Sequence, residues 1–156
     1  MKNKNEELIN EAVELARKYY REGTYLCSEA VLAAVNEVLQ CGMPQEYVSL
    51  TSGFPVGMGG AGCTCGAISG GQCALGLVFG RKKPGGSNRK VMKLSKELHD
   101  KFRQENGSAC CRVLIRDYDF GSKEHKERCT RVTGDTCQIV MELILENKGI
   151  LSKVFK

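Results

Sequence analysis

Cysteine is the residue type best able to do chemistry in this sequence. The chain has 156 residues, of which nine are cysteines and none is tryptophan. Five of the cysteines follow polar or glycine-rich segments where helices are predicted to start, namely Cys27, Cys63, Cys65, Cys110 and Cys111. A helix N-terminus favours the thiolate, which is the form that binds metals and attacks disulfides. These positions therefore predict lowered thiol pKa values and either metal binding or redox chemistry.

The other four cysteines divide into two groups. Cys41, Cys73 and Cys137 are interpreted as small buried hydrophobic residues, whereas Cys129, on the last predicted helix, is a further candidate for the site. The sequence contains no C-x₂-C pair, so spacing alone gives no zinc or iron–sulfur signature. If these cysteines are ligands, they come from separate helices and meet only in the folded protein.

The N-terminus and the cysteine usage indicate a reducing compartment. Residues 1–7 are polar and lead into an amphipathic pattern, with no apolar signal-peptide core. No apolar run approaches the ~18 residues of a membrane span. We therefore expect a cytoplasmic protein that does not bind membranes, in which cysteines are more often ligands or redox groups than permanent disulfides. An odd number of cysteines also cannot form a complete set of disulfides within one chain.

Charge gives no indication of a nucleic-acid partner. The formal net charge is +5, and Lys and Arg alternate with Glu along predicted helices, as on solvated helix faces. The densest basic run, Arg81-Lys82-Lys83, lies in a Pro/Gly loop without interleaved aromatic residues. Both histidines, His99 and His125, occur in charged helical stretches and are expected at the surface.

Hydrophobic periodicity predicts an all-α fold in a single domain over residues 1–156. The expected helices span residues 3–22, 27–40, 44–52, 64–79, 88–106, 110–115 and 124–148. We expect a multi-helical bundle around the helix at 64–79, which is apolar and rich in glycine and alanine. Interior glycines each cost ~1 kcal/mol relative to alanine, so tight packing or access to a site must compensate.

Residues 53–80 hold ten of the 18 glycines, and residues 53–62 are predicted to be a loop. Residues 57–62 match the G-x-G-x-x-G pattern of dinucleotide-binding proteins, but a predicted helix precedes them and a basic run stands where an acidic residue is required. Nucleotide binding is therefore rejected. The alternatives are a plain connector and a loop whose N–H groups stabilise cluster sulfurs or thiolates. The candidate cofactor-binding glycines are Gly57, Gly59, Gly60, Gly62 and Gly66.

Four cysteine segments together resemble the family of redox-active proteins named for a C_GCAxxG_C_C signature. They are Cys27-Ser-Glu-Ala-Val-Leu32, Gly53-Phe through Cys65-Gly-Ala-Ile-Ser-Gly70, Cys111-Arg-Val-Leu114, and Cys129 with the apolar helix after it. The resemblance covers about residues 24–145. The central motif here has cysteine before Gly-Ala, so Cys63 competes with Cys65; Cys110 and Cys137 likewise compete with Cys111 and Cys129.

The resemblance implies redox activity and an iron or iron–sulfur centre, and it implies no substrate. The leading hypothesis is that Cys27, Cys65, Cys111 and Cys129 hold such a centre for single-electron transfer. One alternative is a metal-free protein in which the same cysteines are redox thiols that cycle between dithiol and disulfide. Another is a structural module with zinc in a closed Cys₄ site. The expected partner is an electron-donor or electron-acceptor protein, and a homodimer is left open.

Overall fold

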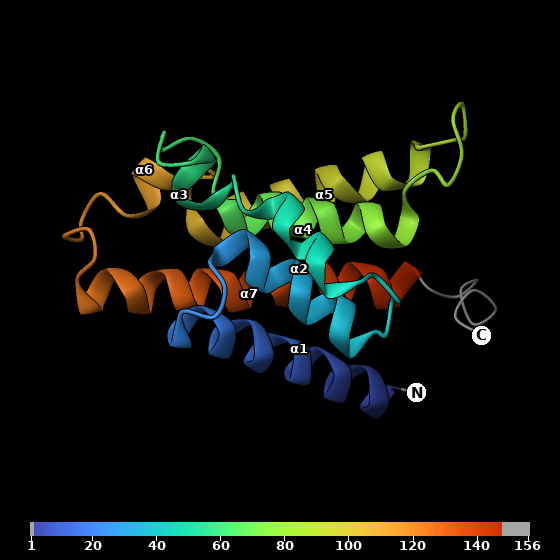
Figure 1. Cartoon of the computed structure of the whole chain (residues 1–156), viewed down its shortest axis with the longest axis horizontal. Helices are drawn as coiled ribbons and strands as arrows, with labels where there is room; N and C mark the ends of the chain where they lie inside the picture. Colours follow the sequence, from blue (N-terminus) through green and yellow to red (C-terminus); the bar gives the residue numbers. More distant parts are fainter. Residues whose placement is uncertain (1, 148–156) are drawn as a thin grey trace.

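The computed structural model describes residues 2–147, and its regular elements are all helical (Figure 1). They are α1 (Lys2–Glu22), α2 (Cys27–Val38), the 3₁₀ helix η1 (Gln45–Thr51), α3 (Pro55–Met58), α4 (Gly66–Phe79), α5 (Arg89–Asn106), α6 (Cys111–Leu114) and α7 (Lys123–Asn147). No strand forms between residues 2 and 147, apart from an isolated antiparallel bridge between Thr64 and Cys110. The all-α prediction is confirmed.

The predicted helix bounds agree with the structure to within about two residues, with two corrections. Residues 45–51 form a 3₁₀ helix rather than an α-helix, the kind of geometry that short connecting turns often adopt. Residues 53–62, predicted to be a loop, contain the one-turn element α3. The predicted end of the last helix, residue 148, lies outside the described residues, as do both ends of the predicted 1–156 domain.

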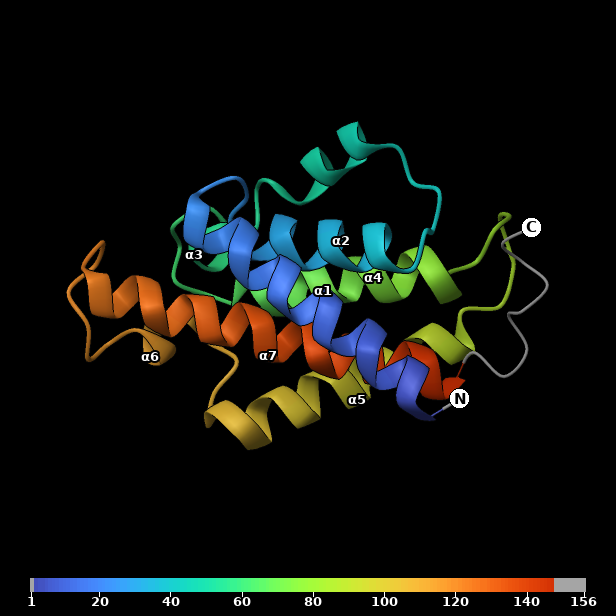
Figure 2. The same cartoon turned by 90° about the horizontal axis from the view of Figure 1, so that it is seen from below.

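The helices pack around the apolar faces of α4 and α7. Figures 1 and 2 show α1 lying along α7, and α2 lying on α4. Helix α4 also contacts α5 and α7. Fully buried side chains from these helices form one core, including Val31, Leu75, Leu98, Phe102, Val140 and Ile144. Across residues 2–147 the structure has no helix with the length and apolar character needed to cross a bilayer.

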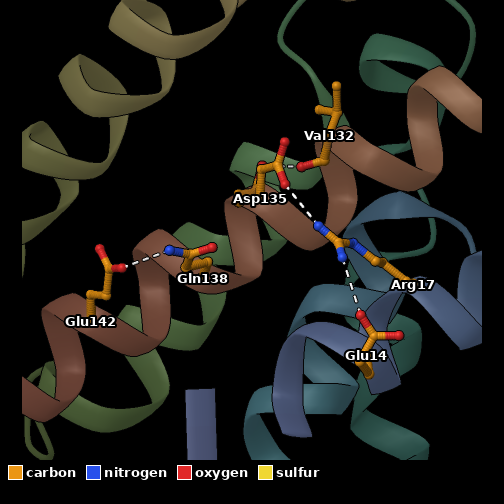
Figure 3. A network of polar contacts seen from close by, with 7 residues as sticks. Glu14, Arg17, Val132, Asp135, Gln138 and Glu142 are labelled. Carbon is orange, nitrogen blue, oxygen red and sulfur yellow. Dashed lines mark hydrogen bonds and ion pairs between the residues drawn. The ribbon is translucent and has the colours of Figure 1, made fainter. Parts of the chain in front are cut away.

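Arg17 links α1 to α7 (Figure 3). Its Nη2 lies 3.0 Å from Asp135 Oδ1, and its Nη1 lies 3.1 Å from Glu14 Oε1. Gly134 makes room for this arginine, because a Cβ at that position would overlap Arg17 Nε. The Glu14 carboxylate is exposed and that of Asp135 is partly exposed, so each ion pair contributes at most about 1 kcal/mol. The buried faces of α1 and α7 therefore provide most of the stability of their contact.

Gly70 lets α2 and α4 approach until their backbones touch. A Cβ on Gly70 would overlap the carbonyl oxygen of Ser28 and lie 2.7 Å from its carbonyl carbon. The hydroxyl of Ser28 is fully buried and donates to the carbonyl of Thr51 at 2.8 Å, which holds η1 against the same end of α2. This contact brings the first turns of α2 and α4 together, and each first turn begins beside a cysteine.

Candidate functional site

Four cysteines from four elements surround one cavity at an end of the bundle. Cys27 begins α2, Cys65 precedes α4, Cys111 begins α6, and Cys129 lies in the second turn of α7. All four line a cavity of about 40 Å³ whose other walls are mostly apolar. Figure 1 shows α3, α6 and the start of α7 at this end. The structure thus brings together the four cysteines predicted as the core of the site.

Backbone pairing determines which cysteine of each close pair faces the cavity. The N–H of Cys65 donates to the carbonyl of Ala109 at 2.8 Å, and the N–H of Cys111 donates to the carbonyl of Cys63 at 2.6 Å. In this arrangement Cys65 and Cys111 are buried, Cys63 is exposed, and the thiol of Cys110 points to the carbonyl of Gly62 at 3.1 Å. The alternates Cys63 and Cys110 do not line the cavity.

The three cysteines interpreted as structural also lie away from the cavity. Cys137 is fully buried, as expected, with its Sγ 3.5 Å from the carbonyl oxygen of Ala12. Cys41 and Cys73 are only partly buried and pack against the core. Cys129, rather than Cys137, is therefore the cysteine of α7 at the site.

Two of the candidate glycines lie directly against site cysteines. A Cβ on Gly66 would overlap Cys27 Sγ, and a Cβ on Gly57 would lie 2.7 Å from Cys111 Cβ. Glycine at these positions therefore makes room for the thiols. Whether either glycine contacts a cofactor stays a prediction.

The other three glycine candidates lie farther from the thiols. The N–H groups of Gly59 and Gly62 donate to the carbonyls of Pro55 and Val56 at 2.9 and 3.2 Å. These two N–H groups are therefore already hydrogen-bonded within the loop. Gly60 is exposed, and none of the three lines the cysteine cavity.

The loop contains a left-handed turn that sequence reasoning did not predict. Residues Val56, Gly57, Met58 and Gly59 have φ values of 57°, 63°, 67° and 66°. For a β-branched residue such as Val56 this conformation is strained. The backbone N–H groups of Val56 and Ser28 lower the pKa of the Cys27 thiol. Two backbone N–H groups therefore favour a negative charge on the Cys27 sulfur.

Burial overturns the prediction of lowered thiol pKa values at Cys27, Cys65 and Cys111. Removal from water raises the pKa of Cys27 to about 11, although the N–H donors of Ser28 and Val56 partly oppose the rise. The pKa values of Cys65, Cys111 and Cys129 are likewise raised, chiefly by burial. Desolvation of a thiolate outweighs the attraction of a helix N-terminus here. These groups are neutral thiols near pH 7 unless a bound cation favours their thiolates.

His125 is buried beside Cys129, contrary to the expectation of a surface position. It is 8% exposed, and its ring packs on Phe120 with centroids 4.8 Å apart. Its Nε2 lies 3.6 Å from Cys129 Sγ. The i, i+4 spacing of the two residues on a helix was the available signal, because it places them on one face. The hydroxyl of Tyr20, on α1, also hydrogen-bonds Cys129 and was not predicted.

Thr133 is a polar residue in the wall of the cavity. It is fully buried, and its Oγ1 has no hydrogen-bond partner among residues 2–147. Buried hydroxyls are nearly always satisfied, so this atom is an exception that the helix packing alone does not explain.

The four thiols surround a space rather than a point. Within residues 2–147, no three His, Cys, Asp or Glu side chains are placed so as to hold one metal ion. A single tetrahedral ion with sulfur ligands at about 2.3 Å requires those sulfurs to lie roughly 3.8 Å apart. The four cavity thiols of residues 2–147 are therefore not drawn together as they are in a closed tetrahedral zinc site.

Comparison with known proteins identifies the family of the chain. The model of the family described as "Putative redox-active protein (C_GCAxxG_C_C)" matches residues 25–143, a span that includes all four cavity cysteines, and the chain belongs to this family. An Archaeoglobus fulgidus protein named "Uncharacterized protein" is 24% identical over 132 residues, which make up 78% of this chain and 86% of that protein. Its name adds nothing about function. No solved structure matches the chain significantly.

The pKa shifts and exposures predict a large difference in alkylation rates. In the reduced, metal-free protein at pH 8, iodoacetamide should modify exposed Cys63 at least ~100-fold faster than Cys27, because burial both shields the Cys27 sulfur and raises its pKa. Peptide mass spectrometry over a time course measures both rates. In urea the two rates should converge, and equal rates in the folded protein would contradict the burial of Cys27.

Proposed function

We propose that the protein is an electron carrier whose Cys27, Cys65, Cys111 and Cys129 hold an iron–sulfur centre. The observation that carries the proposal is that four thiols from separate elements line one small, mostly apolar cavity. When bound, such a centre supplies one-electron chemistry. The partner that this function requires is a protein that donates or accepts electrons.

The residues around the cavity suit a negatively charged cluster. Backbone N–H groups of Ser28 and Val56 lower the pKa of the Cys27 thiol, and those of Ala67 and Ile68 lower the pKa of the Cys65 thiol. Such donors stabilise negative charge on sulfur without adding bulk, and the apolar walls exclude water. Thr133, whose hydroxyl has no partner among residues 2–147, also lines the cavity.

The same observations weigh against the two alternatives. Structural zinc requires four ligands converging tightly on one ion, and the thiols of residues 2–147 do not converge in that way. Thiol–disulfide exchange depends on accessible thiolates, whereas burial raises the pKa of all four cavity thiols. An iron–sulfur centre held by Cys27, Cys65, Cys111 and Cys129 would favour their thiolates despite burial, and it would not require the four sulfurs to converge on one ion.

Reconstitution with ferrous iron and sulfide under anaerobic conditions tests the proposal. Visible absorption, with iron and sulfide measured on the same sample, should reveal a cluster in the wild type and in C63S, C110S and C73S. In C27S, C65S, C111S and C129S, cluster content should fall severalfold or more, while circular dichroism confirms that each variant is folded. A wild type that takes up no iron contradicts the proposal, as does loss in C63S with retention in C65S.

A further inference from the structure

The two nitrogens of His125 have different surroundings. The backbone N–H of Gly121 donates to Nδ1 at 3.1 Å. On the other side of the ring, Nε2 faces Cys129 Sγ at 3.6 Å, within the range of a hydrogen bond to sulfur. The backbone N–H of His125 donates to Ser122 Oγ at 3.1 Å, which anchors the residue in the first turn of α7. The ring is thus held at both edges.

The Gly121 contact determines the tautomer. A nitrogen that accepts a hydrogen bond from a backbone N–H has its lone pair occupied and cannot itself carry a proton. In the neutral imidazole the proton must then reside on Nε2, the nitrogen that faces Cys129. Histidines that ligate a metal through Nε2 show the opposite pattern, in which Nδ1–H donates to a carbonyl or carboxylate.

We propose that His125 is a positioning residue that donates its Nε2–H to the sulfur of Cys129 and is not itself a metal ligand. Its effect on a bound centre rests on the proposed function, whereas its tautomer does not. The hydroxyl of Tyr20 approaches the same sulfur. Cys129 thus has side-chain donors, whereas the N–H groups near Cys27 and Cys65 belong to the backbone.

The hydrogen bond from His125 Nε2–H to Cys129 Sγ should change the reduction potential of an iron–sulfur centre held by Cys129. A hydrogen bond to a ligating sulfur withdraws electron density from it, which favours the reduced state and raises the reduction potential. It also holds the Cys129 side chain in one rotamer, since His125 is itself fixed by Gly121 and Phe120. Removal of the N–H should therefore lower the reduction potential without removing a ligand.

The tautomer can be measured without any metal. The chain has two histidines, so H99Q leaves His125 as the only imidazole. Long-range ¹H–¹⁵N correlation spectra of reduced, metal-free H99Q should show a protonated Nε2 and an unprotonated Nδ1. A protonated Nδ1 would overturn the proposal. This outcome does not depend on whether the protein binds iron, so it separates failure of this inference from failure of the proposed function.

The reconstituted protein gives the second test. H125F keeps a ring of similar size but has no N–H, and its reduction potential should shift to a lower value at unchanged iron content. H125Q can supply an N–H and should restore the wild-type potential, and H99Q is the matched control that should not shift it. Equal potentials in H125F and wild type would overturn the proposal. So would loss of iron in both H125F and H125Q, because His125 would then be a ligand.

Discussion

Replacement of Gly70 by alanine should destabilise the protein by about 3 kcal/mol or more. This is at or above the upper end of the stability cost of inserting extra atoms into a well-packed core. The new Cβ would overlap the carbonyl oxygen of Ser28, which is backbone and cannot rotate away, so α2 and α4 must separate. That separation opens the core that the two helices share. Urea denaturation of the wild type and G70A measures the difference in the free energy of unfolding.

G76A is the matched control on the same helix. A Cβ on Gly76 meets no atom within 4 Å, so alanine there should stabilise the protein by about 0.5–1 kcal/mol through helix propensity alone. The two substitutions are chemically identical, and opposite signs would isolate the effect of the α2–α4 contact. A G70A protein as stable as G76A would contradict the close approach of the two helices.

Replacement of Gly66 by alanine should remove the proposed cluster at a smaller cost in stability. The new Cβ would overlap Cys27 Sγ and lie 3.2 Å from Pro55 Cα. A single thiol can rotate away, so we expect the free energy of unfolding to fall by about 1–2 kcal/mol. The rotated sulfur no longer faces the cavity, and iron content after reconstitution should fall severalfold. Iron analysis and urea denaturation of the same preparation measure both effects.

A double-mutant cycle identifies the atom responsible for the G66A effect. In the metal-free protein, most of the destabilisation by G66A should disappear in a C27A background, because the sulfur that the new Cβ overlaps is gone. G76A should destabilise neither background. If G66A costs the same stability with and without the Cys27 sulfur, the contact between Gly66 and Cys27 is not the cause.

The helical part of the fold could be predicted because its signals are local. The apolar stripe of residues 88–106, with Leu94, Leu98 and Phe102 at spacings of four, predicts a helix whose inner face is indeed buried. Short connections are less determined by periodicity. The 3₁₀ geometry of η1 and the left-handed turn at 56–59 depend on contacts with α2 and on the pairing of residues 62–63 with the loop. Such contacts leave no periodic pattern in the sequence.

The thiol pKa values of the candidate site were harder to predict than the cysteines that form it. The cysteine positions indicate which segments contribute thiols, but the thiol pKa depends on water access, which is a property of the whole fold. The prediction of lowered pKa values considered only the helix starts. It was wrong for Cys27, Cys65 and Cys111, because desolvation is the larger effect. The burial of His125 was also not predicted, because its charged neighbours Lys123, Glu124 and Lys126 indicate a solvent-exposed segment.

The sequence by itself determined the all-α class, most of the helix bounds, and the cysteine segments that contribute to the cavity. These features follow from local periodicity and residue type. Only the tertiary structure decided that Cys65 and Cys111, rather than Cys63 and Cys110, face the cavity. It also placed His125 and Tyr20 beside Cys129. Such choices depend on contacts between segments far apart in the chain, and the sequence specifies them only through the folded core.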